Sequence, residues 1–430
     1  MEYNNFDLMH PRDLIILIIN RIYRKGLTTT SGGNLSIRDE DGRIWITPSA
    51  IDKGSLTPRD IICLHQDGRI EGPHKPSSEL PFHKAIYEIR NDINAVVHAH
   101  PPALVSFSIV RKVPDTRIIP QAQQVCGPIG YARYSLPGSQ QLGENIALEF
   151  SNGVNSVIME NHGTVVGGVN LVEAYERFEA MEFCARTLIN AKSVGEPRFL
   201  NEDQLAAFDA QIPHDVPELD EVVVASDEKA IRAEIVDIVR RACDQGLMMS
   251  TYGTASVRWR GNDFLITSTH VTRWNIGPED IVQIRDGKRE PGKIPSRSMW
   301  LHHEIYKRNP EVNAIILTQP PYLMAFGATH QEMDVKTIPE SWIFLQDMPN
   351  LPFGSQFAGK PDIPELVSKK VSAVLINNDA VVVTGKTLLQ AFDRLEVAEF
   401  SAKSLCMGKA IGDFYPIGDA EIEELRRAFF

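Results

Sequence analysis

The sequence lacks any long apolar run. The longest runs, such as Leu14–Ile19, are far shorter than the roughly 20 residues that span a bilayer. The first ten residues, Met1–His10, carry neither the basic start nor the apolar stretch of a signal peptide. We therefore expect a chain with no membrane partner that stays in the cytoplasm.

Cysteine and positive charge are also scarce. The five cysteines are scattered and odd in number, and none belongs to a CxxC pair: Cys63, Cys126, Cys184, Cys243 and Cys406. This pattern argues against a disulfide framework and against a thiolate zinc site. The formal net charge of −12 disfavours a nucleic-acid partner, because such binding draws on a basic face. It does not exclude an anionic metabolite, which responds to the charges of its own pocket.

A domain-sized repeat organises the sequence. Four blocks recur in one order at an offset of 219 or 220 residues, so that Arg38 falls on Arg258 and Tyr87 on Tyr306. The blocks of the first copy are Gly32–Arg38, Leu56–Ile61, His83–Tyr87 and Val96–Pro102. Four matches in one order indicate a tandem duplication.

Each copy is predicted to be a layered α/β domain. Residues 1–200 form the first copy, 201–226 a linker that contains Pro213 and Pro217, and 227–430 the second copy. In the first copy the apolar spacing predicts helices over 13–24, 78–90 and 171–191, and strands over 44–47, 61–64, 95–99 and 157–159. Helices and strands that cover each other favour an α/β class.

Three histidines of the first copy are candidate metal ligands. His98 and His100 lie two apart in a predicted strand, so both imidazoles project from one face. His162 follows the predicted strand at 157–159, and separate side chains converge where strands end on one edge of a sheet. Taken alone, the His98–His100 pair fits ordinary hydrogen bonding better than metal binding. Three histidines with an open fourth position are typical of a catalytic zinc site.

Two polar turns are candidate anion sites. Ser77, Ser78 and Glu79 open a predicted helix, where helix capping explains them without further assumption. In the functional interpretation, helix-end amides and the two hydroxyls bind an anion while Glu79 acts as acid or base. The turn Ser31–Asn34 is rich in glycine and could bring backbone amides to a phosphate, although such turns are more often only turns.

Together these residues resemble the class II aldolase/adducin family, whose members include L-fuculose-1-phosphate aldolase. The resembling blocks occur in the family's order and cover nearly all of residues 13–192. They are Ser31–Ser36, Ile46–Ser49, Pro76–Glu79, Val97–Pro101 and Asn161–Gly163. The resemblance implies two tandem αβα three-layer domains and a metal-dependent lyase of the aldolase type in carbohydrate metabolism.

The resemblance also implies the residues of the site. Zn²⁺, or another divalent metal, would lie on His98, His100 and His162, with Glu79 as catalytic base and possible fourth ligand. A sugar-phosphate-like substrate, a phosphorylated hydroxy-ketone, would have its anionic group held by Asn34, Ser49, Ala50, Ser77 and Ser78. The implied reaction cleaves or forms a carbon–carbon bond through a metal-stabilised enediolate.

The sequence departs from the family at two places. Ala50 stands where the family usually has glycine, which restricts close approach of a phosphate. Gln121–Gln124 replaces a segment that often supplies a substrate-facing tyrosine. Tyr134 is then a better candidate than Tyr131 for a catalytic donor, or it is simply a residue at the edge of the core.

Other activities fit the same residues. A decarboxylase of a hydroxy acid and a sugar-phosphate epimerase would use the same metal site, and Glu79 favours the aldolase branch over the epimerases. A non-catalytic, adducin-like scaffold is disfavoured, because all three histidines and Glu79 are retained in one copy and lost in the other.

The second copy is predicted to be a pseudoenzyme. Through the repeat, His98, His100, His162 and Glu79 fall on Leu317, Gln319, Asp379 and Ser298. Leucine cannot ligate a metal, and the remaining pair makes a poor zinc site. Since family members form fourfold rings, two chains would form a homo-oligomer with a pseudo-tetramer of domains. Arg273, Arg297 or Trp300 would then be candidates to reach a neighbouring active site.

Overall fold

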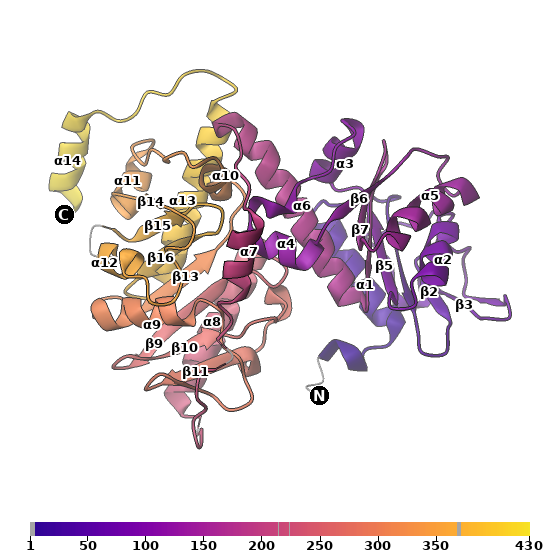
Figure 1. Cartoon of the computed structure of the whole chain (residues 1–430), viewed down its shortest axis with the longest axis horizontal. Helices are drawn as coiled ribbons and strands as arrows, with labels where there is room; N and C mark the ends of the chain where they lie inside the picture. The colour runs from indigo at the N-terminus through magenta and orange to yellow at the C-terminus, as the bar shows by residue number, and fades with distance from the viewer. Residues whose placement is uncertain (1–4, 214, 223, 368–370) are drawn as a thin grey trace. The chain divides into compact units, whose positions relative to one another are not determined.

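The chain folds into two compact units (Figure 1). The computed structural model describes residues 5–213, 215–222, 224–367 and 371–430. The first unit contains Met1–Thr116 and Ala122–Ala185, and the second contains Arg117–Gln121 and Arg186–Phe430. Positions 214 and 223 of the predicted linker lie outside the described residues.

The first unit is built on an eight-stranded sheet with the order β4-β3-β2-β1-β5-β8-β7-β6. Its strands are β1 (Asn34–Arg38), β2 (Ile44–Ile46), β3 (Ile62–Leu64), β4 (Ile70–Glu71), β5 (Ala95–Ala99), β6 (Ile129–Ala132), β7 (Ser156–Met159) and β8 (Gly163–Gly168). Neighbouring strands are antiparallel except for the parallel pair of β6 and β7.

Helices cover both faces of this sheet (Figure 1). On one face α2 (Leu80–Ile89) packs against α5 (Gln140–Ser151). On the other, α1 (Pro11–Arg24) lies beside α6 (Leu171–Val194), and Nζ of Lys25, the residue that follows α1, forms an ion pair of 2.7 Å with Glu179 Oε1 of α6. The shorter helices are η1 (Asn5–Leu8), η2 (Pro58–Asp60), α3 (Pro102–Ile109), η3 (Thr116–Ile118) and α4 (Pro120–Cys126).

Apolar spacing explains why the predicted elements form. In α1 the buried residues recur every three or four positions, which turns one stripe of the helix toward the sheet: Leu14, Ile15, Ile18, Ile19 and Ile22. The predicted strand at 95–99 is β5, whose five residues are all buried. The helix predicted from residue 78 begins instead at Leu80, because Leu80 N donates to Ser77 O and the two serines form the preceding turn.

The second unit repeats the architecture. Its sheet order is β12-β11-β10-β9-β13-β16-β15-β14, which matches the first sheet strand for strand. The strands are β9 (Thr254–Arg260), β10 (Asp263–Thr267), β11 (Ile281–Arg285), β12 (Lys288–Arg289), β13 (Ala314–Thr318), β14 (Asn350–Leu351), β15 (Ala373–Ile376) and β16 (Ala380–Gly385). The register also matches: Asn34 pairs with His98 in the first sheet, and Thr254 pairs with Leu317 in the second.

The helices of the second unit follow the same plan. α9 (Met299–Arg308) and α12 (Asp362–Leu366) lie on one face, and α8 (Ser226–Asp244) and α13 (Leu388–Gly408) lie on the other (Figure 1). The remaining helices are α7 (Glu202–Asp209), η4 (Arg273–Asn275), η5 (Pro278–Asp280), α10 (Leu323–Thr329), α11 (Pro339–Leu345) and α14 (Asp419–Phe429). The predicted pair of αβα three-layer domains is confirmed.

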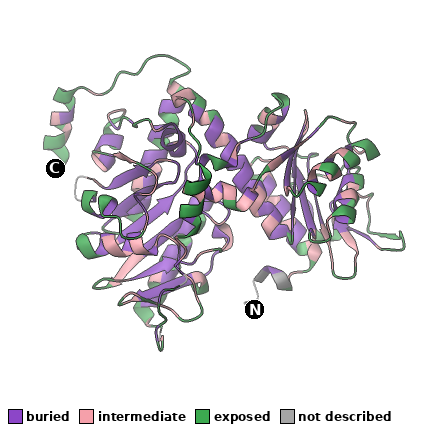
Figure 2. Ribbon diagram, in the orientation of Figure 1, coloured by how far each residue is buried: buried purple, intermediate pink, exposed green. Residues whose placement is uncertain are grey.

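In each unit the centre of the sheet is the most buried part. The central strands β5 and β13 are buried at every position, and strands of both sheets are predominantly purple in Figure 2. Among the described residues, no helix combines the length and the apolar character needed to cross a membrane.

Candidate metal centre

The predicted site residues gather at one edge of the first sheet. Adjacent strands there run antiparallel, so the start of one strand lies beside the end of the next. The relevant ends are the start of β1 at Asn34, the end of β5 at Ala99, the end of β7 at Met159 and the start of β8 at Gly163. His100 and His162 each lie just beyond a strand end, so the fold brings them to His98.

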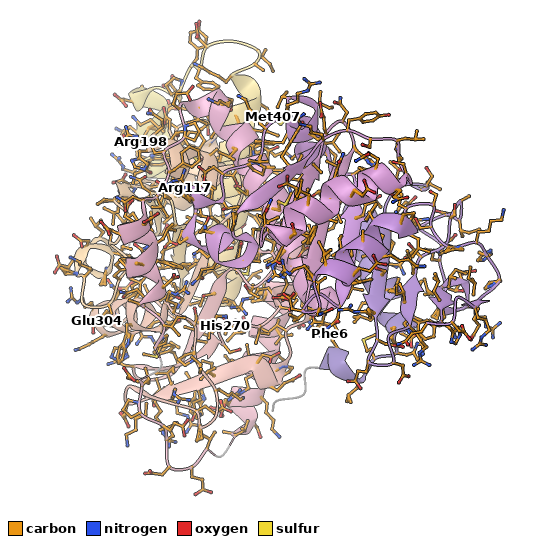
Figure 3. The ribbon with its side chains drawn as sticks, turned by 45° about the vertical axis from the view of Figure 1, so that its right-hand side comes forward. Phe6, Arg117, Arg198, His270, Glu304 and Met407 are labelled. Carbon is orange, nitrogen blue, oxygen red and sulfur yellow. The ribbon has the colours of Figure 1, made fainter. Side chains whose placement is uncertain are left out.

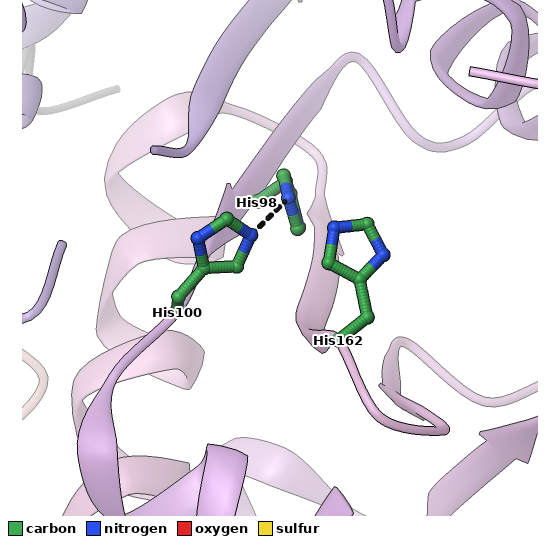
Figure 4. Close-up of side chains that lie close together, drawn as sticks. All are labelled: His98, His100 and His162. Carbon is green, nitrogen blue, oxygen red and sulfur yellow. Dashed lines mark hydrogen bonds between the residues drawn. The ribbon is translucent and has the colours of Figure 1, made fainter. Parts of the chain in front are cut away.

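The three histidines turn their rings toward one another (Figure 4). His98 Nε2 and His100 Nε2 are 3.0 Å apart, and one nitrogen from each of the three rings lies within 4.8 Å of the others. Zinc–nitrogen bonds of about 2.0–2.1 Å in a tetrahedron place two nitrogens about 3.3 Å apart, so this arrangement fits one metal ion. Within the described parts of the chain, no other group of three potential ligands meets this spacing.

A backbone carbonyl orients His98. His98 Nδ1 lies 2.8 Å from Thr164 O, and a carbonyl only accepts, so Nδ1–H donates and Nε2 is directed into the cluster. A hydrogen bond of this kind on the far ring nitrogen is what fixes a metal-binding histidine.

The glycines beside the cluster allow close approach. A Cβ on Gly32 would lie 2.8 Å from His100 Nδ1, and one on Gly163 would lie 2.6 Å from Ala99 O. Larger residues at these positions would displace the loops that carry the histidines.

Glu79 faces the histidines from the start of α2. Its Oε2 is 3.1 Å from His98 Nε2, and its Oε1 is 3.3 Å from His162 Nε2. Glu79 is the N-cap residue of α2, yet its side chain makes no capping hydrogen bond, so capping does not explain it. Oε1 is buried without a hydrogen-bond partner among the described residues, so this oxygen can meet a metal ion or a substrate proton.

Burial and mutual charges within the cluster shift the pKa values of its members. Burial opposes ionisation of Glu79, but the charges of His98 and His162 and the hydrogen bonds from His98 and Asn34 together outweigh burial and lower the pKa of the carboxyl. Burial and the neighbouring histidines lower the pKa of His100 to about 3 and that of His162 to about 4. Both rings are therefore neutral near pH 7, the form in which imidazole binds a metal.

A chain of hydrogen bonds continues behind Glu79. Asn34 Nδ2 donates to Glu79 Oε2 (2.8 Å), and Asn34 Oδ1 lies 2.5 Å from His83 Nε2. On the far side of the ring, His83 Nδ1 is 2.6 Å from Ser36 Oγ, which is 2.7 Å from the Tyr87 hydroxyl. Every one of these side chains is buried.

The acceptors at one end fix the direction of this chain. The Glu79 carboxylate only accepts, which orients the Asn34 amide, and Asn34 Oδ1 must then accept from His83 Nε2–H. Burial lowers the pKa of His83 to about 3, so the neutral ring accepts at Nδ1 from the Ser36 hydroxyl. The sequence did not identify His83 as a site residue. A signal was present, because Ser36, His83 and Tyr87 lie in the recurring blocks and fall on Ser256, His302 and Tyr306 in the second copy.

The predicted anion-binding residues lie on two neighbouring loops. An isolated bridge between Pro48 and Pro76 holds the loops together. Ser77 is buried, and its Oγ accepts a hydrogen bond from the backbone N–H of Glu79 (3.3 Å). Ser49 is half-buried and Ser78 is exposed. Asn34, another of the predicted residues, donates to Glu79 and accepts from His83.

Ala50 occupies a backbone conformation that favours glycine. Its φ is 57°, and the matching residue of the second copy, His270, has the same φ of 57°. The strain at Ala50 agrees with the glycine that the family usually has there. The exposed Ala50 methyl therefore stands where glycine would leave open space.

The predicted catalytic donor Tyr134 is not brought into contact with the cluster. Its side chain is 58% exposed, and its backbone N donates to Glu160 Oε2 (3.1 Å). Among the described residues, no hydrogen bond or ring contact joins Tyr134 to a histidine of the site. Gln121, from the segment that replaces the family's tyrosine, belongs to the second unit, where its Nε2 donates to Asp379 Oδ1.

The corresponding edge of the second sheet lacks the cluster. Leu317, Gln319 and Asp379 occupy the histidine positions, and Asn378 has the φ of 56° that matches the 53° of Asn161. The buried chain is kept only in part: Ser256 Oγ contacts His302 Nδ1 and the Tyr306 hydroxyl, both at 2.7 Å.

His302 has lost the partner that His83 keeps. Its Nε2 is buried without a hydrogen-bond partner among the described residues, because Thr254 replaces Asn34 and bonds Ser296 instead. Arg273, a candidate to reach a neighbouring site, donates within its own unit to the carbonyls of Gly253, Val271 and Ser268.

Both halves match one family model, described as "Class II Aldolase and Adducin N-terminal domain", over residues 13–189 and 233–406. The chain is 36% identical over 202 residues to a 5-deoxy-D-ribulose 1-phosphate aldolase of Bacillus thuringiensis serovar kurstaki, covering 46% of this chain and 93% of that protein. It is 38% identical over 172 residues to an L-fuculose phosphate aldolase of Methanococcus maripaludis, covering 40% of this chain and 92% of that protein.

A third relative has a different activity. The chain is 30% identical over 179 residues to a 3-oxo-tetronate 4-phosphate decarboxylase of Haemophilus influenzae, which covers 41% of this chain and 85% of that protein. These three relatives are therefore two aldolases and one decarboxylase.

Proposed function

The chain belongs to the class II aldolase and adducin family and is an enzyme of the aldolase type, and we propose that its first copy is a zinc-dependent lyase for a phosphorylated hydroxy-ketone. The observation that carries the proposal is the convergence of His98, His100 and His162 within 4.8 Å, with Glu79 beside them. Three imidazoles and one carboxylate are a ligand set suited to zinc.

A divalent metal held there would act as a Lewis acid on the carbonyl and hydroxyl oxygens of the substrate. Glu79 is the base, since the lowered pKa keeps it ionised at neutral pH. Asn34 holds Oε2, which leaves Oε1 to take a proton from the substrate and return it. Ser49, Ala50, Ser77 and Ser78 bind the substrate phosphate on the two adjacent loops, and Tyr134 remains a candidate donor at the rim.

The test is product release by the full-length, metal-loaded protein. L-Fuculose 1-phosphate and 5-deoxy-D-ribulose 1-phosphate, the kind of compound for which the relatives are named, are supplied and aldehyde release is measured. We expect turnover with at least one hydroxy-ketone phosphate and a loss of at least about 100-fold in Glu79→Gln. Turnover that survives Glu79→Gln would remove Glu79 from the mechanism, and a metal-loaded chain inactive toward every such ketose would contradict the aldolase proposal.

Decarboxylation is the second candidate, because the Haemophilus influenzae relative carries that activity. The same metal site and base would serve a β-keto acid phosphate whose carbon–carbon bond breaks to release carbon dioxide. Supplying 3-oxo-tetronate 4-phosphate and measuring carbon dioxide decides between the two, since only a decarboxylase releases it.

The second copy is proposed to be catalytically inactive. Leu317 cannot bind a metal, and Ser298 cannot replace a glutamate base. Its expected contribution is assembly, with two chains forming a pseudo-tetramer of domains. Sedimentation of the full chain tests this, with a dimer expected and a monomer contradicting it.

A further inference from the structure

The second unit contains a pocket at the sheet edge where the first unit carries its metal cluster. The pocket has a volume of about 90 Å³, which exceeds the space that a single water molecule needs. Its lining includes Leu317, Gln319 and Asp379, which stand where the first copy has its three histidines. The pocket therefore lies at the place in the fold where the first unit has its histidine cluster.

A cation, neutral polar groups and a carboxyl line this pocket. Arg297 brings a guanidinium group, and Ser296 and Ser298 bring hydroxyls next to it in the chain. Gln319 and Asp379 bring an amide and a carboxyl at the positions that match His100 and His162. Burial raises the pKa of Asp379 to about 6, and the charge of Arg297 opposes this rise, so the two side chains lie near one another. The pocket thus offers a cation to an anionic group and an amide and a carboxyl to hydroxyl groups.

Gln319 points to a ligand most directly. The side chain is 2% exposed and lines the pocket, yet its Oε1 has no hydrogen-bond partner among the described residues. A buried acceptor without a donor costs about 1–3 kcal/mol, which a ligand hydroxyl would recover. The neighbouring Asp379 is also buried and accepts from Gln121 Nε2 over 2.8 Å.

The linker and one loop of the second copy complete the pocket. Phe208 of α7 lies against Arg297, with the guanidinium carbon 3.8 Å from the ring centroid. Gln211 Oε1 accepts from Ala358 N (3.3 Å), so residues that follow α7 are tied to the loop after β14. These contacts hold the Arg297 side chain against the pocket wall, which suits a preformed binding site.

The loop around His270, labelled in Figure 3, resembles the loop around Ala50 in two respects. His270 has the same left-handed φ as Ala50. Arg273 donates to the Ser268 and Val271 carbonyls of its loop, as Lys53 donates to the Pro48 and Ile51 carbonyls of the first loop. A buried cation therefore braces this loop in both copies, although the histidine cluster is present in only one.

We propose that the second unit binds, without a metal, a small anion that carries hydroxyl groups, with Arg297 on the phosphate or carboxylate and Gln319 and Asp379 on the hydroxyls. Phe208, Trp300 and Leu317 supply the apolar wall for its carbon skeleton. This site is separate from the proposed active site and does not depend on the His98 cluster.

The test is calorimetric titration of the full-length protein after dialysis against EDTA. The probes are glycerol 3-phosphate and glycerate, with neutral glycerol as control. We expect saturable binding of at least one of the two anions and none of glycerol, and the better-bound anion identifies phosphate or carboxylate as the recognised group. Binding of neither anion, or equal binding of glycerol, overturns the proposal.

Variants locate the binding. Arg297→Gln should weaken it at least tenfold and Gln319→Leu about fivefold, whereas Lys288→Gln, at an exposed cation of β12 outside the pocket lining, should leave it unchanged. Unchanged affinity in both pocket variants, or an equal loss in Lys288→Gln, overturns the proposal. Circular dichroism checks that each variant is folded. If Arg297→Gln does not fold, the affinity of Gln319→Leu tests the proposal instead. Zinc content and aldolase turnover are measured separately. Absence of anion binding to the second unit would therefore leave the proposed aldolase function untouched, and absence of turnover would leave the proposed anion site untouched.

Discussion

Asn34 Nδ2 donates a hydrogen bond to Glu79 Oε2 over 2.8 Å, and Asn34 Oδ1 accepts from the ring of His83. The amide therefore ties the proposed base to a buried chain that ends at Tyr87. In the second copy Thr254 stands at the position of this asparagine, and the hydrogen-bond chain ends at His302. The first copy therefore has both the asparagine and the glutamate, and the second copy has neither.

Asn34→Ala should lower turnover without removing the metal. The substitution frees Oε2 of Glu79, so the carboxylate loses its fixed orientation, and losses of about 10–100-fold are typical when a supporting group of a metal site is removed. Turnover and metal content are measured on the same preparation. Thr254→Ala is the matched control and should retain full turnover. An Asn34→Ala enzyme with wild-type turnover would show that the amide does not position Glu79.

His83→Phe should destabilise the chain more than His302→Phe. The first substitution breaks two hydrogen bonds and leaves Asn34 Oδ1 and the Ser36 hydroxyl without the ring as a partner. The second breaks one hydrogen bond and removes a nitrogen that already lacks a partner among the described residues. A difference of about 1–3 kcal/mol in the free energy of unfolding is expected. Urea denaturation followed by circular dichroism measures it, and equal losses would contradict the assigned hydrogen-bond chain.

Ala50→Gly should raise the free energy of unfolding by up to about 1 kcal/mol, because glycine adopts a φ of 57° without the strain that a Cβ brings. His270→Gly is the matched substitution in the second copy and should act in the same direction. Thermal denaturation of both variants provides the comparison. A clear loss of stability in both would show that the left-handed conformation is not strained here.

Glu399 should make the second unit less stable as the pH rises. Its carboxylate accepts from Tyr322 N and Leu323 N, but burial raises its pKa from 4.5 to about 7. The folded state thus binds this proton more tightly than the unfolded state. The resulting stabilisation is complete below about pH 4.5 and is lost as the pH rises through about 7.

Glu399→Gln removes this dependence. Relative to wild type, the variant should gain about 3 kcal/mol of unfolding free energy between pH 4.5 and pH 8, at about 1.4 kcal/mol for each pKa unit. Tryptophan fluorescence during urea denaturation reports mainly on the second copy, which holds Trp259, Trp274, Trp300 and Trp342, against Trp45 in the first. A constant difference between variant and wild type across this range would contradict the raised pKa.

The sequence anticipated the parts of the site that follow from local spacing. His98 and His100 come together because a strand alternates its side chains, and His162 joins them because β7 and β8 meet the same edge as β5. The tandem repeat also predicted two equal sheets, which share one strand order.

What the sequence did not reveal depends on contacts between distant segments. Asn34 and His83 are 49 residues apart, and only the packing of α2 on the sheet brings the amide and the ring together. Gln121 lies between two motifs of the first copy in sequence, Val97–Pro101 and Asn161–Gly163, but it lines the pocket of the second unit, which local patterns cannot indicate. Tyr134 was chosen from its position in a loop, and its 58% exposure arises from the tertiary path of that loop.

The metal content of the full-length protein tests the central claim most directly. Purified without chelators and supplied with zinc, the wild-type chain should contain about one zinc ion per chain by mass spectrometry of the metal. His98→Ala should contain almost none, whereas Leu317→Ala, its counterpart in the second copy, should still contain one. A folded wild-type chain that takes up no metal, or a His98→Ala chain that keeps its zinc, would contradict the account.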